Sequence, residues 1–108
     1  MTHGIDSSAS ALAALGHPAR LSLFRLLVRA EPQGLRVSEI GTLLDIPLST
    51  LAHHLRSLKQ AGLIRQQRDG REVQTRADVQ ALRDVLEFVV CECCEGVATP
   101  TPIQEVAP

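Results

Sequence analysis

Apolar side chains recur every three to four residues in five stretches of the chain, which is the spacing of one helix face. The pattern predicts a short first helix that ends near Gly16. It predicts four more helices over residues 18–30, 37–46, 49–62 and 77–95. Residues that start or stop helices separate them: Pro18, Glu31-Pro32, Asp45-Ile46-Pro47, Gly62 and Gly96.

Two short runs between the fourth and fifth helices favour β-strands. LIRQQ (63–67) and REVQT (71–75) flank Asp69-Gly70, and Asp-Gly between two such runs is typical of a tight hairpin. The predicted fold class is therefore mainly α with a small β-hairpin, in the order four helices, two strands and a last helix.

One domain accounts for the length of 108 residues, and 44% apolar residues are enough for a buried core. We expect a flexible N-terminus over residues 1–9, a folded domain over 10–96 and a disordered tail over 97–108, which is rich in Pro and Thr. The chain has no run of 18 apolar residues and no basic-then-apolar leader, so a soluble cytoplasmic protein is expected, without a membrane partner.

Charge is distributed unevenly along the chain. Residues 1–47 carry equal numbers of basic and acidic side chains. Residues 48–76 carry six basic and two acidic side chains, and residues 77–108 carry one basic and six acidic side chains. A basic middle segment is typical of a surface that binds a polyanion, although a solvated charged surface would look the same.

The fourth helix has two contrasting faces. Leu51, Leu55 and Leu58 form an apolar stripe, and His54 at its border is expected to be packed rather than to touch DNA. The outer face carries hydroxyl, imidazole, guanidinium and amide groups and no carboxylate, as a helix that reads the major groove requires. The predicted DNA-contacting residues of this helix are Ser49, Thr50, His53, Arg56 and Gln60.

The hairpin adds a basic wing directly after this helix. Its arginines are suited to phosphate contacts, which add affinity without sequence choice. The wing arginines are Arg65, Arg68, Arg71 and Arg76, of which Arg68 and Arg71 are the predicted DNA contacts.

Two longer stretches, LGHPARLSLFRLL and VSEIGTLLDIPLSTLAHHLRSLKQAGLIRQQRDGREV, resemble the ArsR/SmtB family of winged-helix metalloregulators over roughly residues 10–90. The resemblance implies a winged helix-turn-helix homodimer in which the first and last helices form the interface. It also implies a repressor that binds double-stranded operator DNA and releases it when an inducer binds. The chain departs from the family at Leu48 and Ala52, where many members carry a polar residue and a serine.

All three cysteines lie in VVCECCEGV: Cys91, Cys93 and Cys94. The third helix has no thiol where one arsenic site of the family lies, and the last helix has no histidine for the zinc-type site. His3 and His17 are isolated and are expected to be exposed or to cap helices. Trivalent arsenic or antimony takes three thiolates beside its lone pair, so the count and the resemblance indicate an As(III) or Sb(III) site at these cysteines, with no organic cofactor.

On an intact helix the three sulfurs would not converge, because Cys93 would lie about 160° around the axis from Cys91. Binding would then have to unwind the last turn or recruit a sulfur from a second subunit. Alternatives stay open: another thiophilic metal (Cd, Pb, Hg, Zn or Cu(I)), a thiol redox switch, or small core residues. The chain shows no nucleophile with a base and no phosphate-binding glycine loop, so we do not expect an enzyme.

Overall fold

A computed structural model describes residues 4–91 of the chain. Its elements follow the predicted order, with one short strand added. They are α1 (Ile5–Leu15), α2 (Pro18–Arg29), β1 (Leu35–Arg36), α3 (Val37–Leu44), α4 (Leu48–Gln60), β2 (Ile64–Asp69), β3 (Glu72–Ala77) and α5 (Val79–Val90). The predicted fold class of helices with a small hairpin, in a winged helix-turn-helix arrangement, is confirmed.

The three strands form an antiparallel sheet in the order β1-β3-β2. Asp69 pairs with Glu72 at the hairpin tip, so the two turn residues are Gly70, with a positive φ of 66°, and Arg71. The tight turn is present as expected, but it lies one residue further along the chain than Asp69-Gly70. Strand β1 was not predicted, because two residues are too few to show an alternating pattern. It places Leu35 opposite Thr75 and thereby joins the start of α3 to the hairpin.

Local hydrogen bonds explain where the helices begin and end. His17 caps α2 as expected, since its Nδ1 accepts from the backbone N–H of Ala19 at 3.2 Å, with Pro18 at the first helical position. Gly62 (φ 77°) ends α4 in a Schellman motif. In that motif the N–H of Leu63 donates to the carbonyl of Leu58 at 3.0 Å.

The core is mostly aliphatic, with Phe24 as its aromatic member, and lies between the five helices and the base of the hairpin. Its fully buried side chains include Leu23, Leu27, Ile40, Leu51, Leu58, Leu63 and Val85. Every helix of the described segment contributes to it. Burial of this face fixes which side of α4 points outward.

Two predicted boundaries are wrong. Helix α1 begins at Ile5, so most of the segment expected to be flexible over residues 1–9 is helical. Helix α5 ends at Val90 rather than near Gly96, and Cys91 has an extended backbone (φ −73°, ψ 124°). The expected tail over 97–108 lies outside the described residues.

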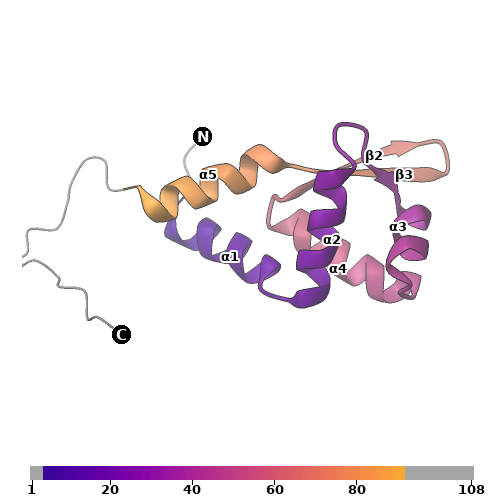
Figure 1. The fold of residues 1–108 in the computed structure, drawn as a ribbon, viewed down its shortest axis with the longest axis horizontal. Helices are drawn as coiled ribbons and strands as arrows, with labels where there is room; N and C mark the ends of the chain where they lie inside the picture. The colour runs from indigo at the N-terminus through magenta and orange to yellow at the C-terminus, as the bar shows by residue number, and fades with distance from the viewer. Residues whose placement is uncertain (1–3, 92–108) are drawn as a thin grey trace, which may run out of the picture.

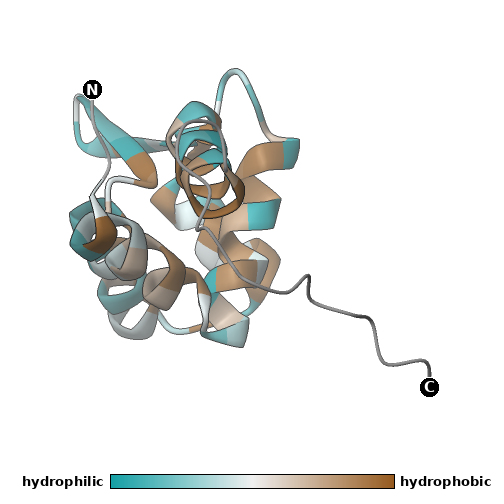
Figure 2. Cartoon of the chain, turned by 90° about the vertical axis from the view of Figure 1, so that its left-hand side faces the viewer, coloured by the Kyte–Doolittle hydropathy of each residue, from teal (hydrophilic) through white to brown (hydrophobic). Residues whose placement is uncertain are grey.

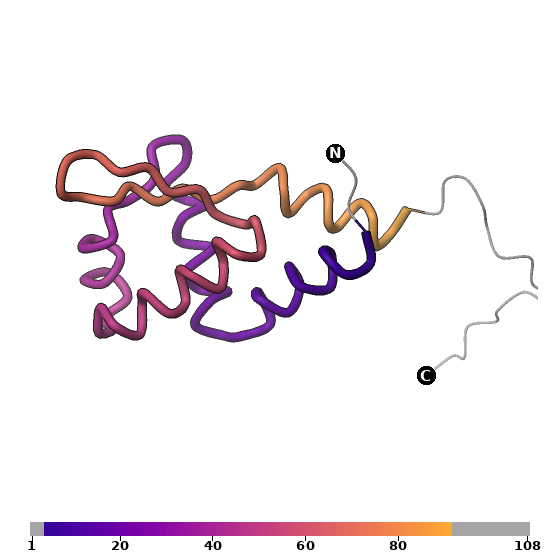
Figure 3. The backbone as a smooth tube through the Cα atoms, turned by 180° about the vertical axis from the view of Figure 1, so that it is seen from behind, coloured from indigo at the N-terminus to yellow at the C-terminus, as the bar shows by residue number. Residues whose placement is uncertain are grey.

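Helices α1 and α5 lie side by side at one end of the molecule, while α3 and the tip of the hairpin lie at the other end (Figures 1 and 3). Within residues 4–91, no single helix has both the length and the apolar content needed to cross a bilayer.

Candidate nucleic-acid interface

The exposed face of helix α4 carries polar and basic side chains and no acidic one. Its opposite face is fixed by Leu51 and Leu58, which are fully buried. The five side chains predicted to read DNA are all exposed: Ser49, Thr50, His53, Arg56 and Gln60. Because α4 contains no acidic residue, nothing on the helix itself repels a polyanion.

The turn between α3 and α4 makes these helices a helix-turn-helix unit. Asp45 ends α3 in the left-handed conformation (φ 53°), and the N–H of Ile46 donates to the carbonyl of Gly41 at 3.2 Å. Gly41 is buried, and a Cβ there would lie 3.1 Å from Cδ2 of Leu48. The lack of a side chain at Gly41 therefore allows the start of α4 to approach α3 closely.

The hairpin forms the wing beside α4. Gln66 and Val73 share one face of the β2–β3 ribbon and line a hollow of about 310 Å³ together with Arg56 and Lys59 of α4. Arg68 pairs with Val73 across the strands, so it lies on this same face, nearer the tip. Helix α4 thus places two basic side chains on the hollow, and the wing carries Arg68 on the same face, nearer its tip.

Arg68 and Arg71 differ from the other arginines of the sheet. Both are exposed, and within residues 4–91 neither makes an ion pair. Arg71 stands in the two-residue turn at the tip of the wing, after Gly70. These two guanidinium groups are therefore available for an external anion.

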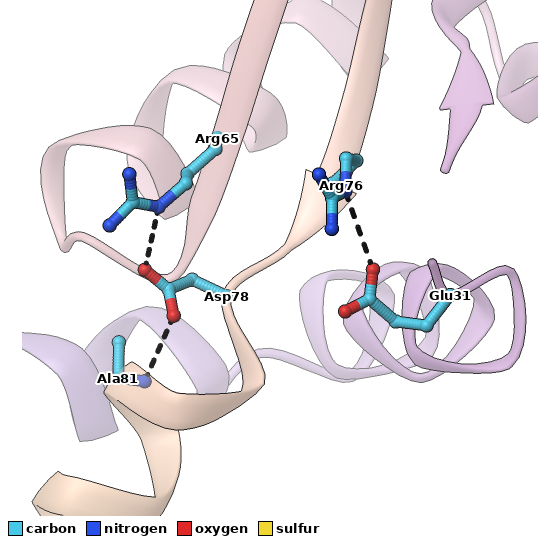
Figure 4. A network of polar contacts seen from close by, with 5 residues as sticks. All are labelled: Glu31, Arg65, Arg76, Asp78 and Ala81. Atoms are coloured by element: carbon cyan, nitrogen blue, oxygen red, sulfur yellow. Dashed lines mark hydrogen bonds and ion pairs between the residues drawn. The ribbon is translucent and has the colours of Figure 1, made fainter. Parts of the chain in front are cut away.

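The other two wing arginines, Arg65 and Arg76, each make an ion pair within the molecule. Arg65 Nε lies 2.9 Å from Asp78 Oδ2, and Arg76 Nε lies 3.6 Å from Glu31 Oε2 (Figure 4). They face each other across the ribbon on the side opposite Arg68. The sequence did not reveal these ion pairs, because the acidic partners lie far away along the chain or after the strand ends.

His54 lies on the buried side of α4, as its position at the border of the apolar stripe predicts. Only 6% of the residue is exposed, its Nδ1 has no hydrogen-bond partner in the described structure, and its ring lies 5.0 Å from that of His17. Burial, with smaller contributions from His17, Arg20 and His53, lowers the pKa of His54 below its ordinary value of 6.5. His54 is therefore a neutral packing residue at neutral pH and not a DNA contact.

The predicted metalloid site falls mostly outside the described residues. Cys91 is exposed, follows the last residue of α5 and is disulfide-bonded. Cys93 and Cys94 lie beyond residue 91. Since Cys91 is already outside the helix, the expected need to unwind a helical turn around it does not arise. Within residues 4–91 no three His, Cys, Asp or Glu side chains are grouped to hold a metal ion.

Comparison with known proteins agrees with this geometry. A family model for a helix-turn-helix domain matches residues 15–67, from the end of α1 into β2. An uncharacterized HTH-type transcriptional regulator of Methanocaldococcus jannaschii is 35% identical over 65 residues, which are 60% of this chain and 71% of that protein.

Solved structures share the fold over about three quarters of this chain or more. A homodimeric winged helix-turn-helix DNA-binding domain from Mycobacterium bovis, described as a possible ArsR-family transcriptional regulator, gives a TM-score of 0.65 at 28% identity. The match covers 80% of this chain and 78% of that one. A possible transcriptional regulator for arsenical resistance gives the same TM-score and identity, with coverage of 74% and 80%.

The packed α3–α4 unit and its basic wing define a winged helix-turn-helix protein. Together with these similarities, they show that the chain belongs to the helix-turn-helix transcriptional regulators and is similar in fold to ArsR-like members.

Proposed function

We propose that the chain is a homodimeric repressor that binds double-stranded operator DNA and releases it when As(III) or Sb(III) binds Cys91, Cys93 and Cys94. The observation that carries the DNA-binding part is the carboxylate-free face of α4 beside a wing whose outer arginines have no internal ion-pair partner within residues 4–91. The proposal gives the chain a binding role and no catalytic one.

In the DNA complex, α4 lies in the major groove and the wing lies along the backbone. Ser49, Thr50 and His53 near the start of α4 approach base edges, while Arg56 and Gln60 extend the contact along the helix. Arg68 and Arg71 contact phosphates and supply salt-dependent affinity.

A homodimer is supported by the apolar surface of α1 and α5. Exposed large apolar side chains gather on these two helices: Ile5, Leu12, Leu86, Phe88, Val89 and Val90. Figure 2 looks at this end of the molecule, where the start of α1 and the last turn of α5 are brown. Joining two copies here would remove this surface from water and place two α4 helices on a common duplex. The Mycobacterium bovis domain is itself homodimeric.

The inducer proposal rests on thiol chemistry. Three reduced cysteines and arsenous acid can form three As–S bonds with release of three water molecules, which satisfies the ion without a fourth ligand. The three cysteines follow α5 directly in the sequence, so an ion bound to them would lie near the proposed dimer interface. A change there needs to disfavour the DNA-bound state by only about 1–3 kcal/mol to weaken binding roughly 5–150-fold. The similarity to a possible regulator for arsenical resistance favours arsenic over other thiophilic ions.

Mass spectrometry of the reduced full chain with arsenite tests the inducer site. One arsenic should be gained with the loss of three thiol protons, and Cys93→Ser should lower the number of protons lost. Cadmium, zinc and antimonite serve as competitors. If zinc displaces arsenite at equal concentration, the metalloid assignment is wrong.

A second candidate is a thiol redox switch on the same DNA-binding scaffold. The disulfide bond of Cys91 favours it. In that case a peroxide would take two electrons from two thiols, and a thiol reductant would restore DNA binding. DNA release by peroxide, with no release of the reduced protein by arsenite, would establish this alternative.

A further inference from the structure

Leu48 stands out on the face that the proposed function gives to DNA. It is the first residue of α4, and 60% of it is exposed, whereas Leu51, Leu55 and Leu58 of the same helix are buried. A single exposed leucine is ordinary on a protein surface, so its neighbours decide whether it has a role.

The first neighbour is Ala52, which is also exposed. Residues four apart lie one above the other on a helix, so Leu48 and Ala52 form one apolar edge. This edge lies between the buried stripe and Arg56, and Ala52 lines the hollow toward the wing together with Arg56. The two side chains therefore belong to the surface that a duplex would cover.

The second neighbour holds Leu48 in place. Gly41 is buried in α3, and its missing Cβ would lie 3.1 Å from Cδ2 of Leu48. One methyl of Leu48 thus rests against the backbone of α3 while the remainder of the side chain faces solvent. Such support reduces the rotamer freedom that the leucine would lose on contact with a ligand.

Leucine and alanine carry neither a hydrogen-bond donor nor an acceptor in their side chains. In the major groove the apolar feature that distinguishes one base pair from the others is the C5-methyl group of thymine. We propose that Leu48 and Ala52 read thymine methyl groups, so that the preferred DNA carries thymine at the positions facing this edge. The inference rests on the proposed DNA-binding function and adds a sequence preference to it.

Leu43 provides a matched control. It is exposed to the same degree (61%) but lies on α3, where it shares a shallow hollow with the carboxylate of Glu39. A carboxylate disfavours contact with DNA, so Leu43 is not expected to touch a base.

The test begins with duplexes that the reduced full chain selects from a random pool. Each thymine of a selected duplex is then replaced by deoxyuridine, which pairs identically but lacks the methyl group. One or two replacements per half-site should weaken binding about fourfold each, the loss expected for one buried methyl group. Deoxyuridine at the position facing Leu48 should leave the affinity of the Leu48→Ala protein unchanged. It should weaken binding of the Leu43→Ala protein as much as it weakens binding of the wild type. Selection with Leu48→Gln should lose thymine at that position.

The outcomes separate the two claims. If the wild-type chain selects no sequence above the random pool, the proposed function fails and the inference fails with it. If it selects a sequence but no deoxyuridine replacement changes its affinity, only the thymine inference is wrong. An equal deoxyuridine effect in wild-type and Leu48→Ala proteins of similar thermal stability would also overturn it.

Discussion

The Nε of Arg65 lies 2.9 Å from Oδ2 of Asp78, and the other oxygen of the same carboxylate accepts from the backbone N–H of Ala81 at 3.1 Å (Figure 4). One side chain therefore joins the base of the wing to the first turn of α5. The N–H of Asp78 also donates to the carbonyl of Leu63 at 2.8 Å. This residue is a direct polar link between the proposed dimer helix and the DNA-binding half of the chain.

Replacing Asp78 by alanine should lower the free energy of unfolding by about 1–2 kcal/mol. Most of the loss comes from the helix cap, about 1 kcal/mol, because the exposed Arg65 makes the ion pair weak. Asp78→Asn keeps a capping oxygen and should lose less than about 1 kcal/mol. Urea unfolding of both proteins measures the difference, and equal losses would contradict the capping role.

Removing Arg68 should weaken binding to every duplex and reduce its dependence on salt. A lost phosphate contact lowers the slope of log K against log salt by about 0.9. Arg76→Ala is the control, since Arg76 pairs with Glu31 and lies on the other face of the ribbon. Fluorescence anisotropy at several salt concentrations measures the slopes. An unchanged slope for Arg68→Ala, or an equal change for Arg76→Ala, would show that the wing does not contact DNA as proposed.

His54 should make the fold less stable in mild acid. Its pKa in the folded protein is lowered, so the unfolded chain binds the proton more readily. The stability that neutral His54 supports is complete above pH about 6.5 and is lost as the pH falls below that value. His54→Gln should flatten this part of the stability profile, whereas exposed His53→Gln should retain it. Thermal unfolding from about pH 5 to about pH 8, the range in which histidine titrates, decides between them.

A charge on the exposed apolar face of α5 should break the dimer. Leu86→Glu and Val89→Glu each place a carboxylate in the proposed interface, and an unpaired buried charge should weaken dimerisation by about 100-fold or more. Leu21→Glu on α2, at a leucine of similar exposure (45%), should leave the dimer intact. Sedimentation equilibrium of the three proteins measures this. A wild-type monomer would refute the interface outright.

The sequence predicts the parts of this molecule that depend on local pattern. Gly62 ends α4, Pro18 begins α2 and Gly70 turns the hairpin, because each acts through its own backbone conformation. The buried position of His54 likewise follows from the spacing of the leucines in α4.

Features that depend on distant partners could not be predicted in this way. The pairing of Arg76 with Glu31 requires knowledge of how the hairpin packs on the end of α2. The end of α5 at Val90 is not marked by a glycine or a proline, so the apolar periodicity alone does not locate it. The contact of Leu48 with Gly41 likewise depends on how α3 and α4 pack across the turn.

The central claim is that a metalloid at the cysteines controls DNA affinity. The decisive measurement is the dissociation constant of a selected duplex for the reduced full chain, with and without saturating arsenite. For the wild type we expect arsenite to raise this dissociation constant roughly 5–150-fold. For a triple variant that carries Cys91→Ser, Cys93→Ser and Cys94→Ser and still binds the duplex normally, arsenite should leave the constant unchanged. An equal constant with and without arsenite in the wild type would contradict the account.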